Sequence, residues 1–130
     1  MMFKNPSESE IAELIKNSKN IAVVGLSPKP DRASNGVARY LQDKGYRIIP
    51  VNPAYPEILG EKSYPDLKSI EEKVDIVDVF RKPDAVMPIS EEAIEIGAGT
   101  LWLQEGVINE EAAQKALDSG LTVIMDRCIL

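Results

Sequence analysis

Short apolar runs alternate with amphipathic stretches along the whole chain. The apolar runs are rich in β-branched residues and are bounded by glycine, proline or polar residues, which is typical of strands that are buried on both faces. The predicted strands are Ile21–Leu26, Tyr46–Val51, Asp75–Phe80, Leu101–Gln104 and Leu121–Met125.

The amphipathic stretches between these runs predict helices. Ser7 and Glu10 have the spacing of a capping box, in which each side chain bonds the backbone N–H of the other residue, so a helix opens there. Pro88 predicts an irregular start for a later helix, because proline has no N–H to donate. The remaining predicted helices lead from Ser34 to Gly45, from about Asp84 to Ile96 and from Asn109 to Gly120.

The stretch Asn52–Asp66 is rich in proline and tyrosine and has no clear period. It predicts a long loop with a short extended piece near Lys62–Tyr64. Asp66 is placed to cap a brief helix that reaches about Glu72.

Alternating strands and helices with short links predict parallel strands joined by right-handed crossovers. The expected fold class is therefore α/β, a Rossmann-like, doubly wound parallel five-stranded sheet with helices on both faces. The expected strand order is 3-2-1-4-5, counted along the chain. No linker, repeat or change in composition divides the sequence, so residues 1–130 are expected to form a single domain.

Charge and composition narrow the classes of partner. The net charge of −6 and the scattered Lys and Arg residues argue against a nucleic-acid partner, which needs a basic face. No apolar run approaches the roughly 18 residues that cross a bilayer, and the start MMFKNPSESE lacks the apolar stretch of a signal peptide. The single cysteine, Cys128, suits a reducing compartment, so a cytoplasmic location is expected.

The chain contains no histidine, which excludes Ser–His and Cys–His nucleophile pairs and removes the usual ligand of zinc and haem. No cysteine cluster replaces it, so neither catalysis nor a metal site is expected. Asp75 and Asp78 lie in one predicted strand, and we interpret them as carboxylates tolerated in a thinly covered edge region, not as a catalytic pair.

Open α/β sheets bind ligands beyond the carboxyl ends of their strands, which makes the loop after Gly25 the first candidate site. Lys29 and Arg32 add positive charge there, and the helix start at Ser34 offers free backbone N–H groups that favour a phosphate. The loop is no G-x-G-x-x-G motif, because Ser27 replaces the middle glycine. The alternative, in which Gly25 only turns the chain and Arg32 is solvated, stays open.

The end of the second predicted strand argues against NAD. NAD-binding domains place Asp or Glu about 20 residues past their glycines to hold the ribose hydroxyls. Here the chain reads Val51-Asn52-Pro53, without an acid, and no adjacent base suits NADP.

Two further strand ends hold candidate residues. Arg81 follows the third strand and can meet a second phosphate, whereas Lys82 is interpreted as a surface residue. Trp102 is interpreted as a core residue in preference to a ligand platform, because alternate strand residues point into a helix layer.

A group of segments points to one protein family: VGLSPKPDRASNGVARYL, YRIIPVNP, DIVDVFRKP, LWLQEGV and VIMDRC. In this order, and over nearly the whole chain, they resemble the small stand-alone CoA-binding domain family, which is similar to the CoA-binding domain of the succinyl-CoA synthetase alpha subunit. Two departures are that the first loop is less rich in glycine than in the synthetase, and that the chain ends at Leu130 where relatives usually continue with a polar tail.

The resemblance implies that coenzyme A lies across the strand ends and that the chain performs no chemistry of its own. The synthetase works through a phosphohistidine in a second domain, and this chain has no histidine. The residues implied to wrap the phosphates are Gly25, Ser27, Pro28, Arg32 and Ser34. Those implied for the adenosine side are Val51, Asn52, Pro53 and Tyr55. Phe80 and Arg81 are implied to lie beside the nucleotide, and Trp102 and Gln104 to face the pantetheine region.

Two alternatives remain at this point. One is a small Rossmann-type enzyme that uses NAD(P) or an acyl-CoA. The other is a regulatory module that senses CoA or acyl-CoA and acts on a protein partner. The absence of the acid that holds the ribose of NAD favours CoA binding over NAD chemistry. Nothing in the sequence distinguishes a protein that only carries CoA from one that senses it.

Overall fold

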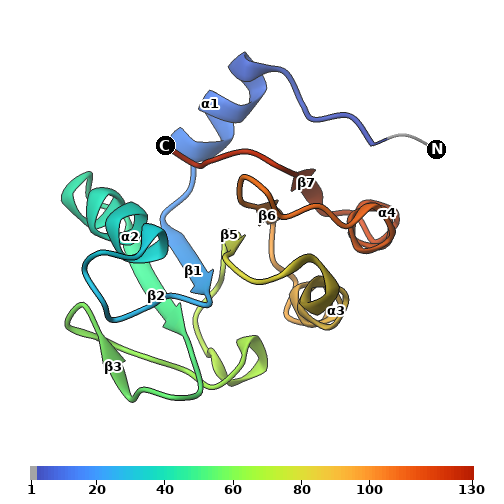
Figure 1. The fold of residues 1–130 in the computed structure, drawn as a ribbon. Coiled ribbons are helices and arrows are strands. Elements are labelled where there is room, and N and C mark those ends of the chain that lie inside the picture. Colours follow the sequence, from blue (N-terminus) through green and yellow to red (C-terminus); the bar gives the residue numbers. More distant parts are fainter. Residues whose placement is uncertain (1–2) are drawn as a thin grey trace.

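A computed structural model describes residues 3–130, and it forms a parallel sheet covered by helices on both faces (Figure 1). The predicted Rossmann-like α/β class with a five-stranded parallel sheet is confirmed. The strands of this sheet are β1 (Asn20–Val24), β2 (Arg47–Val51), β5 (Ile76–Val79), β6 (Thr100–Leu103) and β7 (Thr122–Ile124). The helices are α1 (Glu8–Lys16), α2 (Ala33–Asp43), α3 (Val86–Glu95) and α4 (Glu110–Asp118).

The order of the strands differs from the prediction. It is β2-β1-β5-β6-β7, which is 2-1-3-4-5 along the chain, so the predicted 3-2-1-4-5 is wrong. Asp75, immediately before β5, accepts hydrogen bonds from the backbone N–H groups of Lys19 and Asn20, both at 2.9 Å. The side-chain amide of Asn20 also donates, from Nδ2, to the carbonyl of Lys73 at 2.7 Å. These bonds hold β5 beside β1. The apolar pattern of a strand indicates that both its faces are covered, but it does not indicate which strand lies next to it.

Side chains alternate between two apolar layers, one on each face of the sheet. On β1, Ile21 and Val23 join Trp102 of β6 in the layer beneath α1 and α2. Ala22 and Val24 belong to the other layer, beneath α3 and α4. No helix within residues 3–130 is long and apolar enough to cross a membrane.

Local capping signals decide where several helices begin. The capping box is confirmed at α1, where the Glu10 N–H donates to Ser7 Oγ at 3.2 Å and the Ser7 N–H donates to Glu10 Oε1 at 3.1 Å. Asn109 Oδ1 accepts the N–H of Ala112 at 3.0 Å, as expected for the cap of α4. A separate 3₁₀ turn, η2 (Pro83–Ala85), precedes α3, which confirms the irregular start.

The long loop after β2 contains a small hairpin, β3 (Glu57–Ile58) with β4 (Glu61–Lys62). Tyr64 then pairs with Val51 as an isolated bridge, so the extended piece expected near Lys62–Tyr64 is confirmed. Asp66 caps the 3₁₀ turn η1 (Leu67–Ser69), which is shorter than the predicted helix to Glu72. The hairpin and bridge give the edge strand β2 a short neighbour.

Asp78 lies in the middle of the sheet, between Val23 of β1 and Trp102 of β6. Its side chain is fully buried, and neither carboxylate oxygen has a hydrogen-bond partner within residues 3–130. Burial raises the pKa of Asp78 well above its usual value, because the ionised form loses its hydration and gains no hydrogen-bond partner among the described residues. The expectation that it occupies a thinly covered edge is therefore wrong.

Candidate functional site

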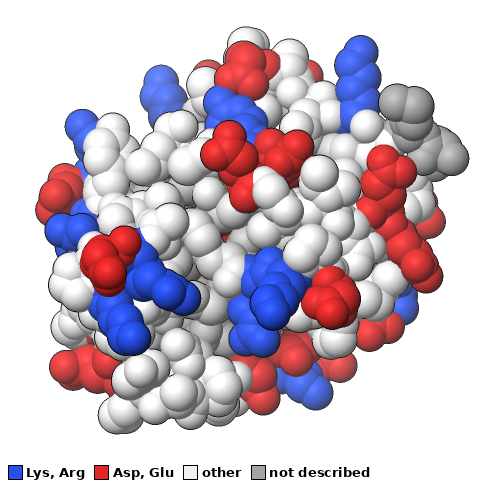
Figure 2. Space-filling model, viewed as in Figure 1, with Lys and Arg blue, Asp and Glu red and all other residues white. Residues whose placement is uncertain are grey.

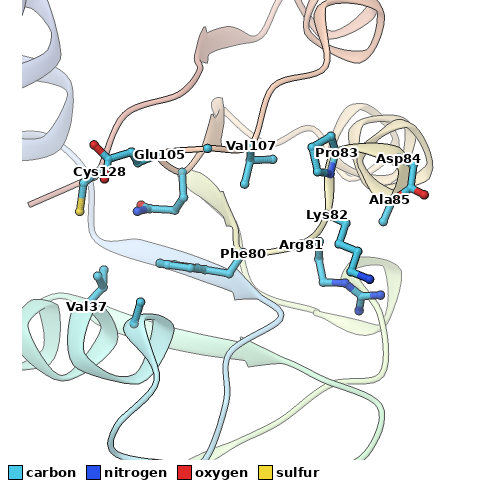
Figure 3. A pocket seen from close by; sticks show the side chains of 13 residues that line it. Val37, Phe80, Arg81, Lys82, Pro83, Asp84, Ala85, Glu105, Val107 and Cys128 are labelled. Carbon is cyan, nitrogen blue, oxygen red and sulfur yellow. The ribbon is translucent and has the colours of Figure 1, made fainter.

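An open cleft of about 760 Å³ lies beyond the carboxyl ends of β5 and β6 (Figure 3). Phe80 lies across its middle, with Arg81 and Lys82 at one end and Cys128 at the other. Its walls come from the start of α2, the segment after β5, the loop after β6 and the chain after β7. The lining residues are Ala33, Val37, 80–85, 104–107 and Cys128.

The strand order creates this opening. From β1 the chain crosses to β2 on one side of the sheet, and from β5 it continues to β6 and β7 on the other side. The crevice of an open α/β sheet forms at such a switch point, here between the ends of β1 and β5. Gly25 directly follows β1 with φ +87°, and a Cβ there would collide with the carbonyl oxygen of Phe80. Only glycine lets these two strand ends approach so closely.

The first loop is folded onto the start of α2 by its own side chains. Ser34 Oγ accepts the N–H of Ser27 at 3.0 Å, and the Asn35 amide donates to the Ser27 carbonyl at 2.9 Å. Arg32 occupies the N-cap without a side-chain capping bond. Within residues 3–130, the backbone N–H groups of Ala33 and Ser34 have no acceptor, so this helix start can receive an anion.

Basic side chains surround this part of the edge. Figure 2 shows positive groups over the β1–α2 loop and over the segment after β5, with largely uncharged surface between them. Lys29, Arg32, Arg81 and Lys82 are exposed there, and none of them forms an ion pair within residues 3–130. The basic residues that do form ion pairs are Arg47, Lys115 and Arg127. Unpaired cations beside free N–H groups make this edge suited to a phosphorylated ligand.

Comparison with known proteins agrees with this chemistry. The family model described as a CoA binding domain matches residues 19–130. The chain belongs to the CoA-binding domain family. The resemblance predicted from the sequence is therefore confirmed.

Small proteins of similar length match nearly the whole chain. The uncharacterized protein YneT of Bacillus subtilis is 50% identical over 127 residues, which cover 98% of this chain and 94% of that protein. A solved structure of a hypothetical protein from Pyrococcus horikoshii is 41% identical with a TM-score of 0.93, covering 99% of this chain and 94% of that one.

Larger CoA enzymes contain a related part. The ADP-forming acetate–CoA ligase of Methanocaldococcus jannaschii is 31% identical over 74 residues, which are 57% of this chain but only 10% of the ligase. The dinucleotide-forming acetyl-coenzyme A synthetase 1 of Ca. Korarchaeum cryptofilum is 25% identical with a TM-score of 0.75, covering 85% of this chain and 26% of the synthetase.

Seven of the residues expected for CoA line three hollows at this edge. The residues expected to wrap the phosphates line none of these hollows; they are Gly25, Ser27, Pro28, Arg32 and Ser34. Phe80, Arg81 and Gln104 line the main cleft. Val51, Pro53 and Arg81 border a hollow of about 180 Å³ toward α3. Asn52, Pro53 and Tyr55 line another of about 300 Å³. Arg81 thus stands between the main cleft and the hollow beside the end of β2.

Trp102 does not reach any of these surfaces. It is fully buried, and its indole N–H donates to the carbonyl of Arg127 at 2.7 Å. The expectation that it faces the pantetheine region of CoA is therefore wrong for this structure, and its interpretation as a core residue is the one supported. Its bond to Arg127 instead supports the chain segment that brings Cys128 into the cleft wall.

Sequence reasoning did not include Val37 and Val107 among the site residues, although both line the cleft. Val37 lies within a predicted helix, and a helix pattern does not show which of its residues lies at the end of the sheet. Val107 lies just beyond a predicted strand end. The rule that ligands bind beyond the strand ends, which indicated Gln104, could therefore have indicated Val107 as well.

Proposed function

We propose that this chain binds coenzyme A, or an acyl-CoA, across the carboxyl edge of the sheet and performs no chemistry of its own. The observation behind the proposal is the group of unpaired cations and free backbone N–H groups beside an open cleft. CoA offers a pyrophosphate and a 3′-phosphate to such groups and a long, mostly apolar arm to the cleft. Membership of the CoA-binding domain family supports the same ligand.

In this proposal the phosphates lie between the β1–α2 loop and Arg81. The Arg32 side chain and the free N–H groups at the start of α2 approach them from one side, and Arg81 from the other. The pantetheine arm follows the cleft over Phe80 toward Cys128, and the adenosine lies toward the hollow lined by Asn52 and Tyr55.

NAD fits this edge less well. Asn52 occupies the position after β2 where NAD-binding domains usually place an acid. Its amide is already used within the protein, because Nδ2 donates to the Leu26 carbonyl at 3.0 Å and Oδ1 accepts the Ala54 N–H at 2.9 Å. A ribose diol therefore meets only the second lone pair of one neutral amide oxygen, where an acid would offer two charged oxygens.

The absence of catalysis is part of the proposal. The carboxylates that line the cleft are Asp84 and Glu105, both exposed, and the chain has no histidine to act with them as a base. Asp78, the carboxyl group with a raised pKa, is buried within the sheet and does not line the cleft. The activities of the larger CoA ligases belong to proteins of which this chain matches a small part.

We also propose that residues 1–130 act as one domain with a small-molecule ligand, in the cytoplasm, where a lone thiol stays reduced. Neither a nucleic acid nor a membrane is expected as a partner.

Calorimetric titration with CoA, NAD and NADP tests the proposed function. CoA is expected to bind more tightly than either dinucleotide. NAD binding that equals or exceeds CoA binding would overturn the proposal. Native mass spectrometry of the purified protein adds an independent measurement, since a retained CoA or acyl-CoA would identify the ligand by mass.

A further inference from the structure

Gln104 is a buried polar side chain in the wall of the cleft. It follows β6 directly and is only 5% exposed, yet it belongs to the cleft lining. Its side-chain oxygen accepts the backbone N–H of Ile129 at 3.2 Å, which ties it to the last residues of the chain. Ile129 is itself buried, so this partner is held in place by apolar packing.

That contact determines which way the amide faces. A backbone N–H can only donate, so the atom of Gln104 that faces Ile129 must be the oxygen and not the nitrogen. The NH₂ group then faces away from Ile129, and no hydrogen bond from it to residues 3–130 is formed. It is not among the fully buried atoms that lack a partner, so it reaches the surface of the cleft. The apolar lining residues Val37, Phe80 and Val107 offer it none. A donor that is fixed at the cleft surface and has no partner within residues 3–130 is free to bond a ligand, which makes it a candidate contact.

We propose that the Gln104 NH₂ group donates a hydrogen bond to a carbonyl oxygen of the ligand's arm. The inference rests on the proposed function, because it takes the arm to be the pantetheine of CoA. Pantetheine supplies amide carbonyls, and an acyl-CoA adds a thioester carbonyl. Both present the same acceptor chemistry to a fixed donor in an otherwise apolar wall. Gln104 thereby selects ligands with a carbonyl-bearing arm over nucleotides without one.

The variant Gln104→Glu separates this role from the anchoring of the chain end. Glutamate keeps an oxygen that accepts the Ile129 N–H, but an ionised carboxylate has no proton to donate to the ligand. Gln104→Met, of similar length and uncharged, removes both the acceptor and the donor. Together the two variants distinguish loss of the donor from added charge.

Four ligands are titrated against the unaltered protein and both variants at about pH 8.5, well above the ordinary pKa of a glutamate side chain. They are CoA, acetyl-CoA, the thioether S-ethyl-CoA and 3′-phosphoadenosine 5′-diphosphate, which lacks the arm. The measured quantity is the affinity for each arm-bearing ligand relative to the arm-less nucleotide, so that any general repulsion of phosphates by glutamate cancels. Thermal unfolding checks that each variant is folded.

Both variants are expected to lower this ratio by about 3- to 10-fold, the effect of one neutral hydrogen bond. Equal losses for acetyl-CoA and S-ethyl-CoA identify an amide carbonyl, and a larger loss for acetyl-CoA identifies the thioester carbonyl. An unchanged ratio in Gln104→Met, which has no donor at any pH, overturns the inference while CoA binding by the unaltered protein still upholds the proposed function. If the unaltered protein binds none of the four, the proposed function and the inference both fail.

Discussion

The carboxylate of Asp126 accepts a hydrogen bond from the backbone N–H of Gly106 at 2.7 Å. Asp126 has a left-handed backbone with φ +59°, a conformation that costs a non-glycine residue about 1–2 kcal/mol. The bond joins the chain after β7, which contributes Cys128 to the cleft, to the loop after β6, which contributes Val107. Strain that the surrounding structure maintains in this way is typical of ligand sites.

Asp126→Gly is therefore expected to weaken CoA binding several-fold with little change in stability. Glycine removes the acceptor that connects the two loops, but it also relieves the left-handed strain. Asp126→Asn is the matched control, because asparagine tolerates this conformation and keeps an oxygen for Gly106. Calorimetric titration and urea unfolding measure the two quantities. Normal affinity in Asp126→Gly would show that this contact does not position the cleft walls.

Replacing Arg32 with alanine tests the phosphate site. Loss of one charge-assisted hydrogen bond, worth ~1.5–3 kcal/mol, is expected to lower CoA affinity ~10–100-fold. Stability should hardly change, because Arg32 is exposed and forms no ion pair within residues 3–130. Arg32→Lys should recover part of the affinity, since it restores the charge without the planar fork. Lys115→Ala controls for the change in net charge; its partner, Glu91, is not among the residues that line the cleft. Equal affinities in Arg32→Ala and the unaltered protein would leave Arg32 as a solvated surface charge.

The buried Asp78 predicts that stability falls with rising pH. Its pKa in the folded protein is raised well above the ordinary value of 3.8 by burial, whereas the unfolded chain ionises near that value. The unfolded state therefore loses this proton first, and the stabilisation present below that pH is lost as pH rises through the raised pKa.

Asp78→Asn removes this titration while preserving the shape of the side chain. We expect a flatter dependence of the unfolding free energy on pH as the pH rises above the ordinary pKa of 3.8, measured by urea unfolding. Asp43→Asn, an exposed position on α2, is the matched control and should retain the original slope. Parallel curves for Asp78→Asn and the unaltered protein would contradict the prediction.

Cys128 lies half-buried in the cleft wall, within the region proposed for the pantetheine arm. Its thiolate can attack CoA disulfide, forming a mixed disulfide with the protein and releasing the other CoA as a thiolate. Arg127 gives limited help, because its guanidinium is already engaged by Glu8 at 2.6 Å and by the Cys128 carbonyl at 2.8 Å.

Intact-mass measurement after incubation with CoA disulfide tests this exchange. We expect a CoA adduct that dithiothreitol removes and that Cys128→Ser does not form. If reversible CoA binding persists without any adduct, Cys128 serves only as part of the cleft wall.

Features that depend on neighbours in the chain were determined by the sequence itself. The capping bonds at Ser7 and Asn109 join residues three positions apart, so their residue types suffice to place the helix starts. The buried strands could be predicted because burial on both faces leaves a continuous apolar run. The rule that ligands bind beyond strand ends then located Arg81 and Gln104, whose place in the cleft the structure shows.

Only the tertiary structure decided which strands are neighbours and how the cleft wall is made. Asp75 holds β5 beside β1 through a residue 55 positions earlier, and two apolar strands contain no signal for that pairing. Similarly, Gln104 presents its NH₂ group to the cleft because Ile129, 25 positions later, takes its oxygen. Trp102 is fully buried and so does not reach the site. The alternation of side chains along a strand does not show whether a residue near the strand end is packed in the core or faces a ligand. These outcomes depend on which distant segments of the chain come together in the fold, and local sequence patterns do not indicate this.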